Sequence, residues 1–480
     1  MLKIRSPSVG VSSDSSDVPL TSVPSSSILP VSAPPLHAKT HPAKKTSKKL
    51  HSSFMPSIVS VLFSTKISVL TIFMPVTVIP YYFLLKFSPE SLDTASPYLF
   101  LGSLLALVPF AERLVLTPHT AQLALHTNDT YSGLLNATFG NFSELILSLL
   151  AMHKRLYRVV QLSLLGSILS NLLLVLGCSC LLGGYRFRIQ RFTTVSGAVS
   201  SGMLMVATAG LVLPCALKMS GQEDDALDEI NFSRGTALVM FFMYWCYLLF
   251  SLKTNQFEFD SVAHAAEERN RSTPKKVGDG HDSDGEEAEI SSLLSSAARS
   301  PVVVADVDDD DEDAVMTYDL ALKWLFAVTA VVGFLSDVLV GTIEAFTERN
   351  GLNPVFTAAI VIPIFGNAAE HAASVMFAYR NKMDICLGIA VGSSIQIALC
   401  VVPACVLLGW ATDRDFSLFF EGYETACLVM TVMTVSFFLI GGTSNWLIGA
   451  LFIGLYIIIA FGFWIHEKEG DSPDNPHEGW

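Results

Sequence analysis

Two short stretches of the sequence place a glycine, a carboxamide and a carboxylate inside apolar runs. They read Gly-Asn-Phe-Ser-Glu at residues 140–144 and Gly-Asn-Ala-Ala-Glu at residues 366–370. On a helix, side chains three residues apart share one face, so the Asn and the Glu of each stretch point the same way. A charged side chain costs roughly 2.5 kcal/mol or more at the centre of a membrane helix. Two glutamates in motifs of the same Gly-Asn-x-x-Glu spacing predict one site to which both motifs contribute.

The oxygens of these stretches suit a hard divalent cation. Glu144 and Glu370 supply up to two negative charges, which matches Ca²⁺. Gly140 and Gly366 allow a helix to break or a neighbour to approach closely, and broken membrane helices expose carbonyl oxygens. Further candidate ligands or orienting groups are the polar residues of the same or facing segments: Asn141, Asn367, Ser167, Ser170, Asn171, Ser393, Ser394 and Gln396. The serines could equally be small packing residues of membrane helices.

The same carboxylates predict coupling to protons. Burial disfavours the charged form of a carboxyl group, so protons and a cation compete for the same oxygens. Ca²⁺ requires the ionised form, so an acidic compartment would release the metal and reload the protons. His371, next to Glu370, is a candidate to share the proton transfer, and a packed, hydrogen-bonded histidine is the alternative.

The composition is that of a polytopic membrane protein. The chain has 480 residues, of which 51% are hydrophobic and only 15% charged, with a mean hydropathy of +0.48. Soluble proteins carry about a quarter charged residues. The net charge of −14 is concentrated, because residues 254–316 hold 17 Asp and Glu against 5 Lys and Arg. We expect a lipid bilayer as surroundings and no nucleic acid as partner.

Apolar windows predict about eleven membrane spans of roughly 20 residues each. They are 67–87, 95–116, 133–152, 160–182, 193–217, 236–252, 318–343, 355–379, 385–410, 423–440 and 445–465. An internal repeat lies within them, because Gly140 and Gly166 are 26 residues apart, and so are Gly366 and Gly392. Five spans per copy, after one extra span, force the two copies into opposite orientations, which is the plan of many secondary transporters.

We therefore expect six parts along the chain. These are a disordered cytosolic tail (1–54), an extra first helix (67–87), a first five-helix repeat (95–252), an acidic cytosolic loop (253–317), a second five-helix repeat (318–465) and a short lumenal tail (466–480). Lysines just before the first span place the N-terminus in the cytosol. The basic loops 153–158 and 380–382 are repeat equivalents, so inversion makes one of them violate the positive-inside rule.

Several motifs resemble those of the vacuolar cation/proton exchangers, the Ca²⁺/H⁺ antiporters of fungi, plants and protists. They are Gly133-Leu-Leu-Asn-Ala-Thr-Phe-Gly-Asn with Glu144, Gly166-Ser-Ile-Leu-Ser-Asn, Val361-Ile-Pro-Ile-Phe-Gly-Asn-Ala-Ala-Glu-His, and Lys382-Met-Asp with Gly392-Ser-Ser-Ile-Gln. The resemblance implies an eleven-helix all-α membrane protein that exports cytosolic Ca²⁺ into an acidic vacuole or similar organelle. It also implies that Glu144 and Glu370 carry the cation and the protons, with no cofactor beyond the transported ions.

Two more carboxylates fit this resemblance. Glu112 and Glu344 lie near the ends of the leading helix of each repeat and are candidate access or supporting residues. The family usually has a Thr-Glu-Gln-type element after the first of them, whereas this chain has Thr120-Ala121-Gln122. That departure leaves the cytosolic access path and its ion selectivity open. The sequence also leaves open whether Mn²⁺ or Cd²⁺ are further substrates, whether the protein forms a homo-oligomer, and whether a regulatory partner binds the N-terminal tail or the acidic loop.

Three other functions fit the sequence motifs less well, and each shares only some of the expected features. A Na⁺- or K⁺-coupled Ca²⁺ exchanger would share the fold, and a channel would share the ion-binding oxygens. An intramembrane hydrolase would need paired aspartates, a Ser–His arrangement or a His-Glu-x-x-His helix, and the expected spans contain none of them. The acidic run at residues 306–313 is either a solvated linker or a low-affinity Ca²⁺ collector.

Overall fold

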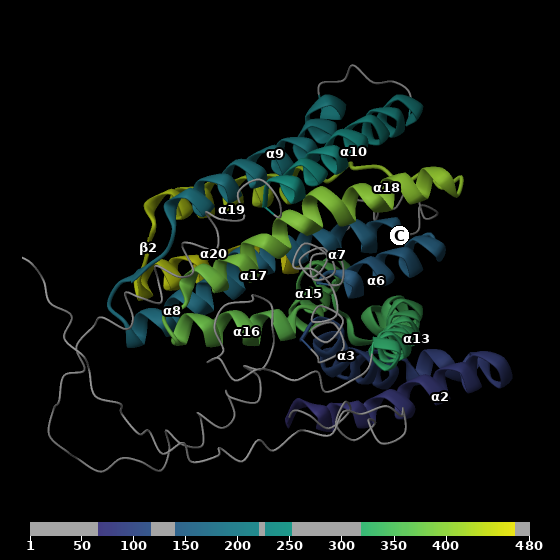
Figure 1. Cartoon of the computed structure of the whole chain (residues 1–480). Helices are drawn as coiled ribbons and strands as arrows, with labels where there is room; N and C mark the ends of the chain where they lie inside the picture. Colours follow the sequence, from purple (N-terminus) through teal and green to yellow (C-terminus); the bar gives the residue numbers. More distant parts are fainter. Residues whose placement is uncertain (1–65, 117–139, 220–225, 252–317, 466–480) are drawn as a thin grey trace, which may run out of the picture. The chain divides into compact units, whose positions relative to one another are not determined.

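The computed structural model describes residues 66–116, 140–219, 226–251 and 318–465 (Figure 1). The expected tails 1–54 and 466–480, the acidic loop 253–317 and the Thr120-Ala121-Gln122 element lie outside the described residues. The described chain is almost entirely helical, which confirms the expected all-α class.

The elements fall into two successive halves. The first half contains η1 (Lys66–Ile72), α2 (Phe73–Phe87), η2 (Pro89–Ser91), α3 (Leu92–Leu116), α6 (Phe142–His153), α7 (Tyr157–Leu169), the π-helical η3 (Ser170–Val175), α8 (Leu176–Arg186), β1 (Gln190–Arg191), α9 (Thr194–Met219) and α10 (Ala226–Leu249). The second half contains α13 (Tyr318–Asn350), α14 (Pro354–Phe356), the π-helical η5 (Thr357–Val361), α15 (Ile362–Gly366), α16 (Ala368–Tyr379), α17 (Met383–Gln396), the π-helical η6 (Ile397–Val401), α18 (Val402–Ala411), α19 (Gly422–Gly441), β2 (Thr443–Ser444) and α20 (Trp446–Ile465).

The expected spans match these helices. By length and composition, nine described helices could cross a membrane, and the pair α14–α15 with α16, bent by 57°, makes a tenth. The remaining expected span, 133–152, is represented by the 12-residue α6, because residues 117–139 lie outside the described part. Spans four and nine are longer than expected, at 30 and 29 residues, since π-helical turns continue α7 into α8 and α17 into α18.

Four helices of the first half, α3, α6, α7 and α8, start 226 residues before α13, α16, α17 and α18 of the second half. α3 and α13 start at Leu92 and Tyr318, and α6 and α16 have the same length and matching ends. Both short helices end in a loop with one residue at positive φ, Arg155 at 63° and Asn381 at 62°. The offset seen in the sequence motifs therefore extends to the local backbone.

Several helix ends are fixed by local side chains. Glu421 and Glu424 form a reciprocal capping box at the start of α19, and Gly442 ends that helix with a φ of 63°. Asn445 accepts hydrogen bonds from the backbone N–H groups of Leu447 and Ile448 at the start of α20. These caps explain why α19 and α20 begin where they do.

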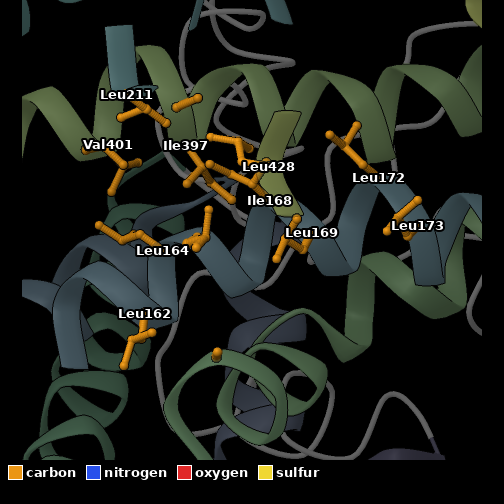
Figure 2. Close-up of a cluster of buried hydrophobic side chains, with 14 of the residues drawn as sticks. Leu162, Leu164, Ile168, Leu169, Leu172, Leu173, Leu211, Ile397, Val401 and Leu428 are labelled. Carbon is orange, nitrogen blue, oxygen red and sulfur yellow. The ribbon is translucent and has the colours of Figure 1, made fainter. Parts of the chain in front are cut away.

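The core gathers around α7 and η3. Figure 2 shows leucine and isoleucine side chains of this segment packed against residues of α9, η6 and α19, among them Leu211, Ile397 and Leu428. α3 also packs along α13, where the rings of Phe100 and Phe346 stack with centroids 4.2 Å apart. One short antiparallel pair, β1 with β2, joins the halves through Gln190 opposite Ser444. Contacts between the halves thus position the segments that carry the two motifs.

Candidate functional site

α6 and α16 both begin immediately after an asparagine of the repeated motif. Asn141 and Asn367 have non-helical backbone angles, with φ of −114° and −95°, and at Asn367 the span is interrupted between α15 and α16. The interruption places Glu144 and Glu370 in the first turn of a new helix. Helix N-termini carry a partial positive charge, which favours a carboxylate there.

Ser393 connects side chains from four elements. Its hydroxyl donates to Oδ1 of Asn141 at 2.8 Å and also lies 3.2 Å from Oε2 of Glu370. Nδ2 of Asn171 donates to the same carboxylate oxygen at 3.2 Å and to the Ser393 hydroxyl at 3.1 Å. All four side chains are buried, with at most 8% of their surface exposed. The structure therefore brings residues of both halves into one hydrogen-bonded cluster.

Glu144 lies at a small cavity beside this cluster. The cavity has a volume of about 20 Å³, which is enough for about one water-sized particle. It is lined by Leu107, Ser143, Glu144, Leu147, Ser163, Leu164, Ser167, Ile362, Pro363 and Gly366. The Ser143 hydroxyl donates to Oε2 of Glu144 at 2.8 Å. Since Ile362, Pro363 and Gly366 belong to the other half, the Glu144 carboxylate faces the interface of the halves.

The two carboxylates belong to one buried region. Both are 7% exposed, and Gly366 of the Glu370 motif lies so close to Glu144 that a Cβ atom there would be 4.0 Å from its Oε1. Among the described residues, no group of three or more His, Cys, Asp or Glu is placed to hold a metal ion. A cation here would be bound by two carboxylates and neutral oxygens, a ligand set that suits a hard ion.

Buried polar atoms without partners lie next to the carboxylates. Within the described part of the chain, neither side-chain polar atom of Asn367 has a hydrogen-bond partner, and Asn367 is 1% exposed. Nδ2 of Asn141 and Oδ1 of Asn171 are also buried and also lack a hydrogen-bond partner within the described part of the chain. Such atoms are rare in native interiors and mark a place for a further ligand.

The other predicted site residues lie at varying distances from this cluster. Ser167 lines the cavity, and Gly140 and Gly366 precede the two asparagines. His371 contacts Ser170, with 3.1 Å between Nε2 and Oγ, which is the packed, hydrogen-bonded alternative. The Ser394 hydroxyl donates to the Ala390 carbonyl within its own helix.

Three of the predicted site residues take no part in the hydrogen bonds of this cluster within the described part of the chain. Gln396 is buried at the end of α17, and within the described part of the chain no hydrogen bond joins it to either glutamate. Glu344 is exposed on α13. Glu112 lies on α3, but its side chain is outside the described part. Sequence reasoning missed Ser143 and Ser163 as cavity residues, although Ser143 stands inside the first motif.

Comparisons with known proteins identify similar sequences and a similar fold. The family described as "Sodium/calcium exchanger protein" matches residues 95–253 and 320–465. The chain is 38% identical over 424 residues to "Vacuolar cation/proton exchanger 2" of Oryza sativa subsp. japonica, covering 88% of this chain and 86% of that protein. It is also 38% identical over 425 residues to "Vacuolar cation/proton exchanger 5" of Arabidopsis thaliana, with the same coverage.

A solved structure is similar as well. The "Ca2+/H+ antiporter" YfkE aligns over 83% of this chain and 100% of its own, with a TM-score of 0.59 and 28% identity. The described fold and the matched segments therefore point to the same group of proteins as the motifs.

Proposed function

The chain belongs to the sodium/calcium exchanger family, within its vacuolar cation/proton exchangers, and from this premise we propose that it exports cytosolic Ca²⁺ in exchange for lumenal H⁺. It is a secondary transporter, a multi-pass protein of the vacuolar membrane. The observation that carries the Ca²⁺/H⁺ assignment is the pair of buried carboxylates, Glu144 and Glu370, set in matching helix N-termini beside neutral oxygens of both halves. This donor set fits a divalent cation, and the carboxylates can carry protons instead.

The proposed cycle alternates two occupants of one site. Cytosolic Ca²⁺ binds the ionised carboxylates, with the unpartnered amide oxygen of Asn367 as a neutral ligand, and two protons leave. After the site opens to the acidic lumen, protons return to the carboxylates and Ca²⁺ is released. Ser393 and Asn171 hold the Glu370 carboxylate in place through both states.

Alternating access requires segments that can rearrange. The halves, related by the 226-residue offset, would act as two inverted five-helix repeats preceded by the extra helix α2. The second half carries a broken span at its motif, the π-helical η3 of the first half contacts α16 of that span, and π-helical turns occur frequently at functional sites. We propose that opening on either side occurs around this break and these turns.

We propose the orientation from the lysines that precede the first expected span, because positive charge next to a span favours the cytosolic side. With a cytosolic N-terminus and eleven spans, the acidic segment and loop 380–382 are cytosolic, and loop 153–158 and the C-terminus are lumenal. Lys154 of loop 153–158 pairs with Asp337 at 2.8 Å, and Arg158 pairs with Glu421 at 2.8 Å and with Glu424.

The test is Ca²⁺ uptake and proton flux measured together in sealed vesicles that contain the purified protein. An inside-acid gradient should drive uptake, a protonophore should abolish it, and Glu144→Gln and Glu370→Gln should each eliminate it. Glu90→Gln, at an exposed position, is the control and should transport normally. Mn²⁺ and Cd²⁺ as competitors would define the cation range.

Two outcomes would replace the proposal. Uptake that ignores the proton gradient but follows a Na⁺ or K⁺ gradient would make the protein an exchanger of that ion. Ca²⁺ currents without countermovement of protons would make it a channel.

A further inference from the structure

A line of buried polar groups runs between α8 and α16, outside the site described above. Ser179 of α8 and Ser374 of α16 are both fully buried, and their hydroxyl oxygens are 3.2 Å apart. The Ser374 hydroxyl also lies 3.0 Å from Sγ of Cys386 on α17. α8, α16 and α17 pack against one another, as Figure 1 shows. A serine pair in this setting joins helices, and its hydroxyls can also exchange protons.

The pair lies in line with Glu370. Ser374 follows Glu370 by four residues on α16, so the two side chains share one face, one helical turn apart. Such positions have Cβ atoms about 5–6 Å apart. One water molecule can bridge a carboxyl group and a hydroxyl at that separation.

One turn further along the two helices lie Ala378 and Gly183, next to the side-chain amide of Gln190. There, Gln190 of β1 inserts its buried amide, donating from Nε2 to the Ala378 carbonyl at 2.7 Å and to Oδ1 of Asn381 at 3.2 Å. Room for this amide exists because residue 183 is glycine, where a Cβ atom would collide with Oε1 of Gln190. That Oε1 atom has no hydrogen-bond partner within the described part of the chain. Asn381 is half-buried, beside the exposed Arg380.

The equivalent line in the other half is interrupted. The counterparts of Ser374 and Ser179 at the 226-residue offset are Ser148 and Cys405, both buried. One turn further lie Met152 and Gly409, where the atoms nearest to a Cβ atom on Gly409 would be the Arg414 carbonyl oxygen and the Phe416 Cβ at 3.3 Å and the Met152 sulfur at 3.6 Å. Among the described residues, the serine pair and the Gln190 amide lie on successive turns between Glu370 and loop 380–382, and no described hydrogen bond spans the interval from Glu370 to Ser374 or from Ser179 to Gln190.

We propose that Ser374 and Ser179 form a proton relay between Glu370 and the end of the molecule where β1 and loop 380–382 lie. In the structure Ser179 donates to Ser374, and Ser374 donates to the Cys386 carbonyl oxygen at 3.3 Å. A proton leaving the Glu370 carboxyl group passes to a bridging water, which gives one to Ser374; the two hydroxyls turn, and Ser374 releases its own hydroxyl proton to Ser179. A second water at Oε1 of Gln190 carries the proton from Ser179 to the solvent, and each group returns to its starting protonation state. The proposal rests on the proposed Ca²⁺/H⁺ exchange and adds a separate proton route on one side, the cytosolic side in the proposed orientation.

The test compares two exchange modes of the full-length protein in vesicles. Ca²⁺/H⁺ exchange needs proton movement at Glu370, whereas exchange of Ca²⁺ for radioactive Ca²⁺ at equal pH does not. The double variant S179A/S374A should slow Ca²⁺/H⁺ exchange about 100-fold or more, in the range of positioned proton-transfer groups, and leave Ca²⁺/Ca²⁺ exchange unchanged. Ser374→Thr, which retains a hydroxyl, should restore most of the Ca²⁺/H⁺ rate relative to Ser374→Ala.

Ser336→Ala is the matched control, because Ser336 is a fully buried serine of α13 whose hydroxyl has no partner among the described residues. Equal slowing of both modes would show that the serine pair is only structural, and an unchanged Ca²⁺/H⁺ rate would show that protons take another route. Either result overturns the relay. Failure of the exchange function itself would appear differently, as absence of proton-driven uptake in the unmodified protein.

Discussion

Asn171 of η3 donates a hydrogen bond to the Glu370 carboxylate of α16, with 3.2 Å between Nδ2 and Oε2. The bond crosses between the two halves of the chain. The equivalent hydrogen bond to Glu144 cannot form, because the residue 226 positions after Asn171 is Ile397, whose side chain has no donor. The two carboxylates are therefore unequal: Glu370 is held by an amide and a hydroxyl, whereas Glu144 is held by Ser143 and faces the cavity.

Replacing Asn171 with leucine should weaken Ca²⁺ binding. The substitution keeps similar volume but removes the donor that orients Glu370, and loss of such a supporting hydrogen bond typically costs 10–100-fold in metal affinity. We expect the KM for Ca²⁺ uptake to rise by about tenfold. Ile397→Val, at the equivalent position, should leave KM near the unmodified value. An unchanged KM in the Asn171 variant would mean that this amide does not position the ligand.

Substitutions at Gly366 should show a size limit. A Cβ atom there would lie 4.0 Å from Oε1 of Glu144, an ordinary contact distance, so Gly366→Ala should retain most of the uptake. Gly366→Leu would fill the cavity of about 20 Å³ and should eliminate uptake while the protein still elutes as a folded species in detergent. Uptake by the leucine variant would show that the cation does not use this cavity.

Alanine substitutions at two equivalent glycines, Gly166 and Gly392, should change stability in different ways. A Cβ atom at Gly166 would collide with the Ala359 carbonyl and the Pro363 ring, whereas one at Gly392 would meet nothing within 4 Å. Gly166→Ala should lower stability by about 1–3 kcal/mol. Gly392→Ala should be neutral or stabilising by up to about 1 kcal/mol, since alanine favours helix. Thermal unfolding in detergent measures both, and equal shifts would contradict the packing.

Removing Arg158 should destabilise the protein. Its guanidinium pairs with Glu424, whose side chain is fully buried, and with Glu421, so Arg158→Ala leaves a buried charge without its partner. The expected cost is about 3 kcal/mol, visible as a lower unfolding temperature. Arg349→Ala, at an exposed position, is the control and should shift the temperature little. A double variant R158M/E424L that recovers stability would confirm that the unpaired carboxylate causes the loss.

Ca²⁺ binding should strengthen as pH rises, because protons and the cation compete for the same carboxylates. The apparent Kd should fall by up to about tenfold per pH unit for each proton displaced. Calorimetric titration of the purified protein should therefore give a steeper pH dependence for the unmodified chain than for Glu370→Gln, which can release only the Glu144 proton. Identical slopes would mean that Glu370 does not exchange its proton for Ca²⁺.

The fold could be predicted from the sequence largely because membrane helices follow from hydropathy and because the repeat preserves spacing. The 26-residue interval after Gly140 and Gly366 predicts the same local backbone twice, and the structure has matching helix ends and matching positive-φ residues at Arg155 and Asn381. Some expected span ends were wrong by three to seven residues: the span 160–182 is a helix over 157–186, and the span 318–343 continues to Asn350, since a helix can extend past its apolar run.

Contacts between the halves could not be predicted. Nothing in the spacing of Arg158 and Glu424, or of Lys154 and Asp337, indicates that they pair across 183 residues or more. Among the site candidates, the cluster around Ser393 involves Asn141 and Asn171 as expected of a shared site, whereas Ser394 bonds within its own helix. One helical position separates these two serines, and the sequence alone does not fix which of them faces the neighbouring helix.

The β1–β2 pair has a consequence for how the protein could be assembled. Gln190 and Arg191 of the first half bind Ser444 and Thr443 of the second through backbone hydrogen bonds, and Gln190 also reaches Asn381 by its side chain. A gene divided within codons 252–317 would yield two polypeptides whose complementary surfaces already include these bonds. Co-expressed fragments should consequently reconstitute a working complex, whereas either fragment alone would expose its interface to lipid.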